Sequence, residues 1–373
     1  VGLRRAFTSL ANRSFRVYWA STMCQMAAMN MQMVVQSLLV YRLTHSPAML
    51  GVMSLANALP MLFFSLFGGV IADRGQKKNV LVAGQVVSGL ITLATALAIS
   101  FDAISWVFLL VTYVLQGLVW ALIMPSRQAI IPELVGQEAL TNAIGLNMSA
   151  MNINRLLTPA LAGFMVAKWD FDVAYYTMAA LFLAATVLVM ALPPTSTISL
   201  KGSGTMRSIQ EGLAYVRSNT ILLSVLAVTL VMVLLSMPYM MLLPVFTEDV
   251  LKVGADSFGV LMSVSGAGAL VGSIVIASLR DKNRGALLMY SALVLGIALV
   301  GFSISNNFYL SLVMMVPIGL GQTGRMALSN ALVQSYTEDQ YRGRVMSRFM
   351  MEVGLTSCST FGAGVLAQFV GVQ

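Results

Sequence analysis

Long apolar segments follow one another along almost the whole chain, and this feature limits the possible folds more than any other. A segment of about 20 mostly apolar residues is long enough to cross a lipid bilayer as a helix. Of the 373 residues, 58% are hydrophobic and only 10% are charged, whereas soluble domains carry about 25% charged residues. The sequence therefore predicts an all-α polytopic membrane protein.

Eleven segments have the length and hydropathy expected of a membrane-spanning helix. They are residues 17–41, 49–72, 79–100, 104–126, 141–166, 173–193, 220–246, 257–279, 285–304, 308–332 and 345–371. The loops between them are short except for residues 194–219, which begin with the polar stretch "PTSTISLKGSG". We therefore expect an N-terminal six-helix bundle at residues 1–193, a linker at 194–219 and a C-terminal bundle with five spans at 220–373.

The linker also contains "MRSIQEGLAYVRSN", in which Ile209, Leu213 and Val216 fall on one helical face. This spacing predicts an amphipathic helix on the membrane surface. A partly ordered tether is the alternative.

The basic residues divide unequally between the two sides of the membrane if successive spans alternate in direction. Only Arg42, Lys168 and Lys252 fall on one side. The other side receives Arg4, Arg5, Arg13, Arg16, Arg74, Lys77, Lys78, Arg127, Lys201, Arg207, Arg217, Arg280, Lys282, Arg284, Arg342, Arg344 and Arg348. Because cytoplasmic loops are enriched in Lys and Arg, we expect a plasma-membrane protein with a cytoplasmic N-terminus and a cytoplasmic linker.

Two arginines and one carboxylate remain inside the predicted spans, namely Arg155, Arg325 and Glu352. A charge at the centre of a spanning helix costs about 2.5–3.5 kcal/mol on insertion scales, so such residues usually face a cavity or a partner. Arg155, with Asn152 one helical turn before it, is expected to line a central cavity, where it holds an anionic substrate group or pairs with a carboxylate. The alternative is that Arg155 caps carbonyl groups of a neighbouring helix.

Glu352 and Arg325 each allow two interpretations. Glu352 is the single carboxylate in any predicted span, so it is the candidate for a protonatable coupling group. It could instead pair with Arg344 or Arg348 on the same helix. Arg325 either faces the cavity or extends its side chain toward the cytoplasmic surface.

The first predicted span carries an unusual number of amides, including Asn30 and Gln36 as candidate substrate contacts beside Gln25 and Gln32. Three of its methionines, Met26, Met29 and Met33, share one helical face. Methionine is flexible and polarisable, which suits a cavity that accepts several hydrophobic shapes. Ordinary packing is the leading alternative, and a copper(I) thioether site would need converging ligands that the sequence does not indicate.

Other chemistry finds little support in the sequence. There is no GxxxxGK[ST] phosphate-binding loop, no nucleophile–base constellation, and the basic residues lie in short loops rather than on the basic face of a nucleic-acid-binding domain. His45 lies in a short polar loop, and Cys24 and Cys358 lie in apolar segments without paired spacing. We expect no enzyme activity, no metal site and no cofactor.

The loop after the second span reads "GGVIADRGQKKNV", with Gly69 before a charged cluster of Asp73, Arg74, Lys77 and Lys78. This stretch resembles the signature loop between helices 2 and 3 of the major facilitator superfamily. The stretches "NRLLTPALAGF" and "DQYRGRVMS" are similar to the efflux branch that includes the enterobactin exporter. The resemblance implies a two-lobed helical bundle, a gating role for this loop, and twelve helices, of which the last is expected to be missing from this sequence.

The resemblance also carries two details of the helices. "TPALAG" is similar to the fifth-helix motif of antiporters in the superfamily: Pro159 and Gly163 match, while Thr158 and Ala162 replace glycines. It implies a bend at this point. Many proton-driven members carry an arginine three residues before a Gln-Gly pair in the fourth helix, and Tyr113 stands there in this chain.

Together these features predict a secondary active transporter that works by alternating access. Its expected activity is proton-coupled export of a small amphipathic or anionic organic molecule across the lipid bilayer. Two alternatives remain. One is a transporter-like structural or assembly subunit of a larger membrane complex, and the other is a lipid or lysolipid translocator.

Overall fold

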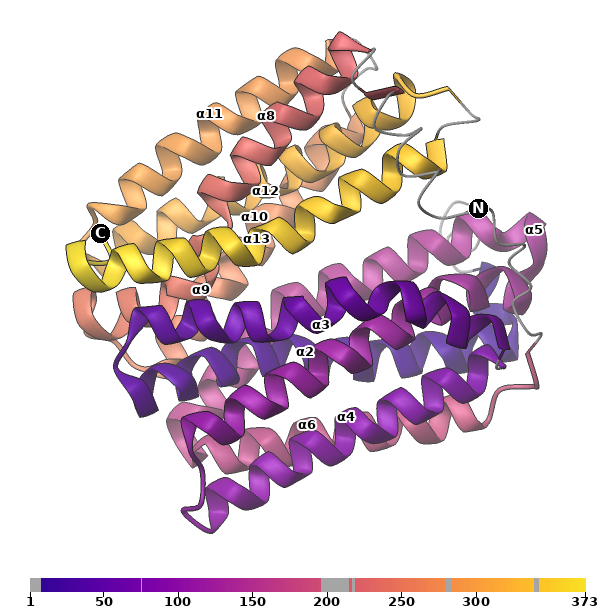
Figure 1. The fold of residues 1–373 in the computed structure, drawn as a ribbon, viewed down its shortest axis with the longest axis horizontal. Coiled ribbons are helices and arrows are strands. Elements are labelled where there is room, and N and C mark those ends of the chain that lie inside the picture. Colours follow the sequence, from indigo (N-terminus) through magenta and orange to yellow (C-terminus); the bar gives the residue numbers. More distant parts are fainter. Residues whose placement is uncertain (1–7, 75, 196–214, 217–218, 279–282, 339–341) are drawn as a thin grey trace. The chain divides into compact units, whose positions relative to one another are not determined.

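The computed structural model describes residues 8–74, 76–195, 215–216, 219–278, 283–338 and 342–373, and these form helices joined by short loops (Figure 1). The helices in chain order are η1 (Thr8–Ala11), α2 (Arg13–Thr44), α3 (Pro47–Arg74), α4 (Lys77–Ser100), α5 (Trp106–Trp169), α6 (Phe171–Met190), α8 (Thr220–Ser236), α9 (Pro238–Val245), the π-helix η2 (Phe246–Val250), α10 (Ala255–Ser278), α11 (Arg284–Ser303), α12 (Phe308–Ser335) and α13 (Arg342–Val370). The predicted all-α class is confirmed.

The predicted spans are helical, but 220–246 is divided between α8 and α9, and two other spans share one helix. The spans 104–126 and 141–166 both belong to α5, whose backbone leaves helical geometry only at Gly136, with φ 70° and ψ 175°. The prediction that Arg127 lies in a loop is therefore wrong. The segment between the two spans contains no glycine before Gly136, and glycine is the residue that adopts positive φ without a steric cost.

Six helical segments of the described chain are long and apolar enough to cross a membrane. They are Lys77–Ser100, Trp106–Gly136, Phe171–Met190, Thr220–Val250, Ala255–Ile276 and Arg284–Ser303. The predicted span 17–41 is not among these six; it lies on the helix α2, which carries several buried amides. Helices that bury polar side chains inside a bundle need not be apolar all round, so their lower hydropathy fits an interior position.

By its internal contacts the chain divides into two compact units. Unit 1 comprises Val1–His45, Met53–Leu200 and Ala255–Gly259, and unit 2 comprises Ser46–Val52, Lys201–Gly254 and Val260–Gln373. The predicted boundaries at 193 and 220 stay a prediction. The predicted amphipathic helix of the linker lies mostly outside the described residues.

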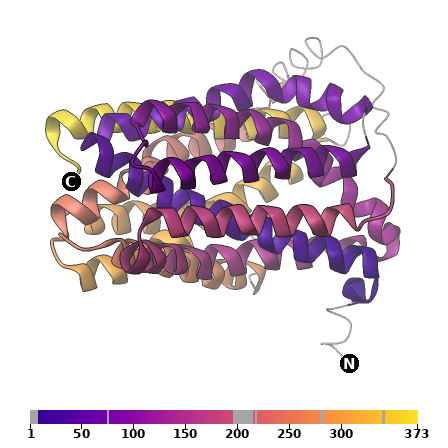
Figure 2. The same ribbon diagram turned by 90° about the horizontal axis from the view of Figure 1, so that it is seen from below.

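In unit 1, α2 and α4 each pack against both α5 and α6 (Figures 1 and 2). The core between them contains Phe15, Tyr18, Leu81 and Ile130, all almost fully buried. Asn12 caps the start of α2 by accepting hydrogen bonds from the backbone N–H groups of Ser14 and Phe15, which satisfies donors that a helix N-terminus leaves open.

In unit 2, α12 packs against α11 and α8, and α13 packs against α8 and α9. Glycines allow the closest approach within this unit. A Cβ on Gly319 of α12 would lie 1.9 Å from the carbonyl oxygen of Ser265 on α10, a distance that no real side chain tolerates. Small residues at such contacts let helix backbones approach closely in membranes.

Candidate functional site

A buried polar cluster in unit 1 joins four helices around Arg127. The Arg127 side chain is 6% exposed and donates from Nη1 to Oε1 of Gln25 on α2 at 2.5 Å. Gln85 on α4 donates from Nε2 to the same oxygen at 3.1 Å and toward Oγ of Ser21 at 3.4 Å. Ser21 in turn donates to the carbonyl oxygen of Ala185 on α6 at 2.9 Å. The cluster therefore links α5, α2, α4 and α6.

Several polar atoms of this cluster are buried without a hydrogen-bond partner among the described residues. They are Nη2 of Arg127 and Oε1 of Gln85; Oγ of Ser126, the residue before Arg127 on α5, is buried in the same way. Buried polar groups are normally hydrogen-bonded, and an orphaned one calls for a physical explanation. The guanidinium also has no carboxylate within ion-pair distance in the described part of the chain.

Arg127 is the functional candidate that sequence reasoning missed. The stretch "MPSRQAIIPE" reads as a loop because two prolines flank the arginine. The structure instead continues α5 through both Pro125 and Pro132. The signal that could have found Arg127 is the apolar run Ala129–Ile131 beyond it, with no glycine before Gly136.

Unit 2 also buries an arginine, and here the sequence had singled it out. Arg325 on α12 is 5% exposed, so its side chain does not extend to the surface. Its Nε and Nη2 atoms both lie 3.3 Å from Oε1 of Gln322, one turn earlier on the same helix. Gln322 then donates to Oγ of Ser236 on α8 at 3.3 Å.

Arg155 occupies a different environment from the two buried arginines. It lies on α5 beyond Gly136, is half-buried, and makes no hydrogen bond or ion pair within the described residues. Asn152 beside it is also half-buried. The buried amide near Arg155 is that of Asn154, the first residue of the stretch "NRLLTPALAGF". It donates to the carbonyl oxygen of Ala150 and accepts from the hydroxyl of Thr158.

The predicted bend at Pro159 stays a prediction, and the helix is unbroken at this residue. α5 runs through Pro159, and its one departure from helical geometry is at Gly136. Gly163 serves close packing within unit 1, because a Cβ there would lie 2.2 Å from the carbonyl oxygen of Ala255.

The amides of α2 fall into two groups. Asn30 is half-buried and donates to the carbonyl oxygen of Met26 on its own helix, whereas Gln36 is 5% exposed. Met26, Met29 and Met33 lie on one face of α2 as their spacing predicts, but their burial differs, since Met26 is 9% exposed and Met33 is 40% exposed.

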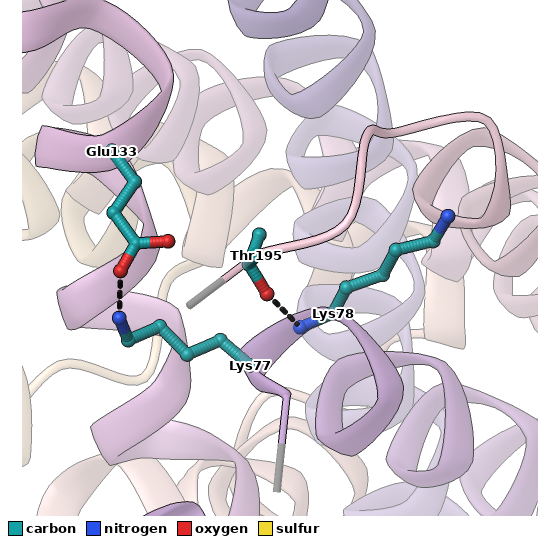
Figure 3. A network of polar contacts seen from close by, with 4 residues as sticks. All are labelled: Lys77, Lys78, Glu133 and Thr195. Atoms are coloured by element: carbon teal, nitrogen blue, oxygen red, sulfur yellow. Dashed lines mark hydrogen bonds and ion pairs between the residues drawn. The ribbon is translucent and has the colours of Figure 1, made fainter. Parts of the chain in front are cut away.

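A second polar network closes one end of unit 1 around Lys77 and Lys78 (Figure 3). The Lys77 ammonium forms an ion pair with Glu133 on α5. The backbone N–H of Lys78 donates to Oγ1 of Thr195 at 3.0 Å, and its ammonium donates to the carbonyl oxygen of Leu192 just beyond α6. These bonds connect the start of α4 to α5 and to the segment after α6.

Four predicted site residues have side chains outside the described part of the structure. Gly69, Asp73 and Arg74 lie on the last turns of α3, and Glu352 lies on α13. The structure thus brings Lys77 and Lys78 together at one end of unit 1 and places Arg155 and Arg325 in separate units.

These observations define a class. A chain of long apolar helices in two units, each of which buries an arginine and amides, is built as a polytopic membrane protein. The chain belongs to the transmembrane secretion effector family of the major facilitator type, whose model matches residues 4–373. It is therefore a membrane transporter and not an enzyme.

Curated relatives of this chain are transporters. It is 25% identical over 331 residues to the staphyloferrin A transporter of Staphylococcus aureus, which covers 88% of this chain and 83% of the relative. It is 24% identical to macrolide efflux protein A of Streptococcus pyogenes, with 89% and 84% covered. The enterobactin exporter EntS of Shigella boydii is 20% identical over 89% of this chain and 80% of its own length.

Solved structures agree on the fold. The nucleoside transporter NupG matches with a TM-score of 0.75 at 13% identity and covers 96% of this chain and 93% of its own. A bacterial homologue of the human lysosomal transporter Spinster matches with a TM-score of 0.73 at 15% identity, with 95% and 82% covered. At such low identity these likenesses show the fold alone.

Proposed function

We propose that this protein exports a small amphipathic or anionic organic molecule by alternating access, in exchange for protons. The family and its relatives support a transporter that moves small molecules out of the cell. The proposal adds a substrate class, a driving force, and the residues that bind the substrate and exchange the proton.

The observation that carries the proposal is the environment of Arg155. This cation lies on a long helix, partly accessible and without a hydrogen-bonding or ionic partner among the described residues. An intramembrane charge of this kind is costly unless it serves a pathway or a ligand. A partly accessible guanidinium can form bidentate hydrogen bonds with a carboxylate of an arriving substrate. Asn152, also half-buried, supplies a neutral amide one helical turn away.

Glu352 is the proposed coupling group. It is the only carboxylate in any of the eleven predicted spans, and a carboxyl group in an apolar setting can exchange a proton near neutral pH. Asn30, Gln36 and Arg325 are proposed as further contacts for substrate or for the coupling carboxylate. The loop from Gly69 to Lys78 is the proposed gate.

The membrane orientation is also a proposal, and the basic residues support it. The end of unit 1 that carries Lys77 and Lys78 is the end to which the positive-inside rule assigns the cytoplasm. We place the protein in the plasma membrane with its N-terminus on that side.

The test uses everted membrane vesicles that contain the protein and a pH-sensitive dye. Enterobactin, staphyloferrin A, a macrolide and a lysolipid are added in turn, and substrate uptake and proton release are followed together. Wild-type protein is compared with Arg155→Ala, Arg155→Lys and Glu352→Gln. Lys168→Gln is the control, because Lys168 is a cation at the end of the same helix, where it contacts the rings of Phe164 and Trp169.

We expect Arg155→Ala to lower uptake of an anionic substrate by at least about tenfold, the effect of losing roughly 1.4 kcal/mol of binding. Arg155→Lys should retain part of the uptake, and Lys168→Gln should retain all of it. Glu352→Gln should abolish proton release. Uptake that continues unchanged in Arg155→Ala, or proton release that persists in Glu352→Gln, would contradict the corresponding assignment.

A further inference from the structure

A groove of about 300 Å³ lies between α4 and α6, which pack side by side in unit 1 (Figure 1). Leu90 of α4 and Leu183 of α6 line the groove and are 59% and 65% exposed, so it opens outward from this pair of helices. Small residues leave the space free, because Gly89, Ala179 and Ala180 stand where larger side chains would fill it.

The helix faces around the groove are apolar as well. Val87 and Leu97 of α4 and Val187 of α6 are between 41% and 59% exposed, and both helices are long and apolar enough to cross a membrane. Polar residues of membrane helices face the bundle interior or a water-filled cavity, so this apolar face is the one that meets lipid. Gly89 lies about 18 Å from the start of α4 at 1.5 Å per residue, which places the groove near the middle of this 24-residue helix.

The polar residues that line the groove use their polar groups elsewhere. The amide nitrogen of Gln85 donates to side chains of α2, and its amide oxygen is fully buried. The hydroxyl of Thr186 donates to the carbonyl oxygen of Phe182 on its own helix, and the hydroxyls of Tyr176 and Ser100 pair at 3.2 Å. None of the described residues that line the groove is charged. These contacts favour an occupant without polar groups.

The dimensions of the groove match a single hydrocarbon chain. On α4 it extends from Gln85 to Leu93, eight residues or about 12 Å at 1.5 Å per residue. Its volume of about 300 Å³ divided by this length leaves a cross-section of about 25 Å², or about 5 Å across. An extended polymethylene chain is about as wide as one carbon–carbon contact, about 4 Å, whereas a helix with its side chains is about 10–12 Å across.

From these observations we infer that the groove between α4 and α6 is a binding site for one acyl chain of a membrane lipid. The chain lies against Gly89, Ala179 and Ala180, whose atoms would have no contacts in an empty groove. Lipid tails surround the protein already, so dispersion contacts hold the chain in the groove, and the hydrophobic effect adds little. The site recognises the chain and not the headgroup, and it does not depend on the proposed substrate site at Arg155.

The test uses the full-length protein reconstituted in phosphatidylcholine bilayers. A trace of the phosphatidylcholine carries a diazirine near the end of one acyl chain, at the depth of the groove. Illumination crosslinks this chain to the side chains that it contacts, and mass spectrometry of the peptides identifies them. We expect labelling of α4 and α6 several-fold above that of α11, where Leu293 and Ile297 also lie mid-helix and are 59% and 64% exposed.

A groove-filling variant and its control locate the labelled site. Ala180→Phe places a ring in the groove and should lower the labelling of α4 several-fold. Ala184→Phe should leave it unchanged, because Ala184 is also exposed, one turn further along α6, but does not line the groove. Gly89→Leu fills the groove from α4 and decides the matter if Ala180→Phe fails to fold, since a Cβ at Gly89 would lie at an ordinary 3.4 Å from Cβ of Phe182.

A second lipid separates recognition of the chain from recognition of the headgroup. Phosphatidylglycerol with the same photoreactive chain should label the groove as strongly as phosphatidylcholine does. Labelling by the anionic lipid alone would contradict the chain site and assign the effect to the cations Lys77 and Lys78 at the end of unit 1. Labelling of α4 and α6 no stronger than that of α11, or unchanged in the groove-filling variants, would overturn the site and leave only the ordinary layer of surrounding lipid.

Discussion

The two units bury an arginine each, but they connect it to the rest of the bundle differently. In unit 1, Arg127 on α5 reaches directly across to Gln25 on α2. In unit 2, Arg325 on α12 first bonds Gln322 on its own helix, and Gln322 then reaches Ser236 on α8. The Arg127–Gln25 bond thus joins two helices, whereas the Arg325–Gln322 bond lies within one helix and Gln322 makes the contact with the next.

This difference has an energetic consequence. A cation that bonds across helices loses its acceptor whenever the helices separate, so the interhelical contact includes the cost of a buried, unpaired charge. A cation bonded on its own helix keeps its acceptor during such a movement. We therefore expect the Arg127–Gln25 bond to couple α2 and α5 more tightly than the Arg325–Gln322 bond couples α8 and α12.

The largest effect should come from removing the shared acceptor of unit 1. Gln25→Leu leaves both Nη1 of Arg127 and Nε2 of Gln85 without Oε1, and should destabilise the folded protein by about 3 kcal/mol. The measurement is the free energy of unfolding in mixed micelles titrated with denaturing detergent. Gln32→Leu is the matched control, since Gln32 is also buried on α2 but makes no hydrogen bond among the described residues. Equal losses in the two variants would contradict a special role for Gln25.

The corresponding change in unit 2 should cost less. Gln322→Leu removes the oxygen that Arg325 contacts, but Arg325 retains a further interaction of its own. A loss of about 1.5 kcal/mol is expected, as for hydrogen bonds that involve a charged group. Gln334→Leu, near the exposed end of the same helix, serves as the control. If Gln322→Leu proved as damaging as Gln25→Leu, the proposed difference between the units would disappear.

A third cation, Lys77, has an acidic partner, which Arg127 lacks among the described residues, and this changes the expected cost of losing the partner. Its side chain is 6% exposed, but it pairs with Glu133, which is 27% exposed. Because solvent screens the pair, Glu133→Gln should cost only about 1 kcal/mol. The loss should shrink when salt is raised, since salt screens exposed charges. Asp102→Asn, in an exposed loop, is the control. A loss that is unaffected by salt would mean that the pair is effectively buried.

The sequence predicts the helices well and their internal contacts poorly, for a physical reason. Span lengths and hydropathy locate almost every helix, because each must cross a bilayer of fixed thickness. A contact such as Gln25 with Gln85 depends on how two helices are rotated about their axes, and that rotation is set by packing rather than by local sequence. The error at Arg127 is of another kind, since flanking prolines gave a helical segment the composition of a loop.

The smallest effect is expected for a neutral hydrogen bond of unit 2. Removing it tests whether neutral contacts or the arginine network hold α8 and α12 together. The hydroxyls of Thr229 on α8 and Ser329 on α12 form a hydrogen bond of 2.7 Å, and both residues are fully buried. Thr229→Val keeps the shape of the side chain and should cost about 0.6 kcal/mol, the average for interhelical hydrogen bonds in membrane proteins. Thr186→Val is the matched control, because the buried hydroxyl of Thr186 bonds only the backbone of its own helix. A loss for Thr229→Val that clearly exceeds the control while staying below that of Gln322→Leu would rank the contacts of unit 2 as proposed. A loss as large as that of Gln25→Leu would show that the neutral pair, and not the arginine network, is the main polar link between α8 and α12.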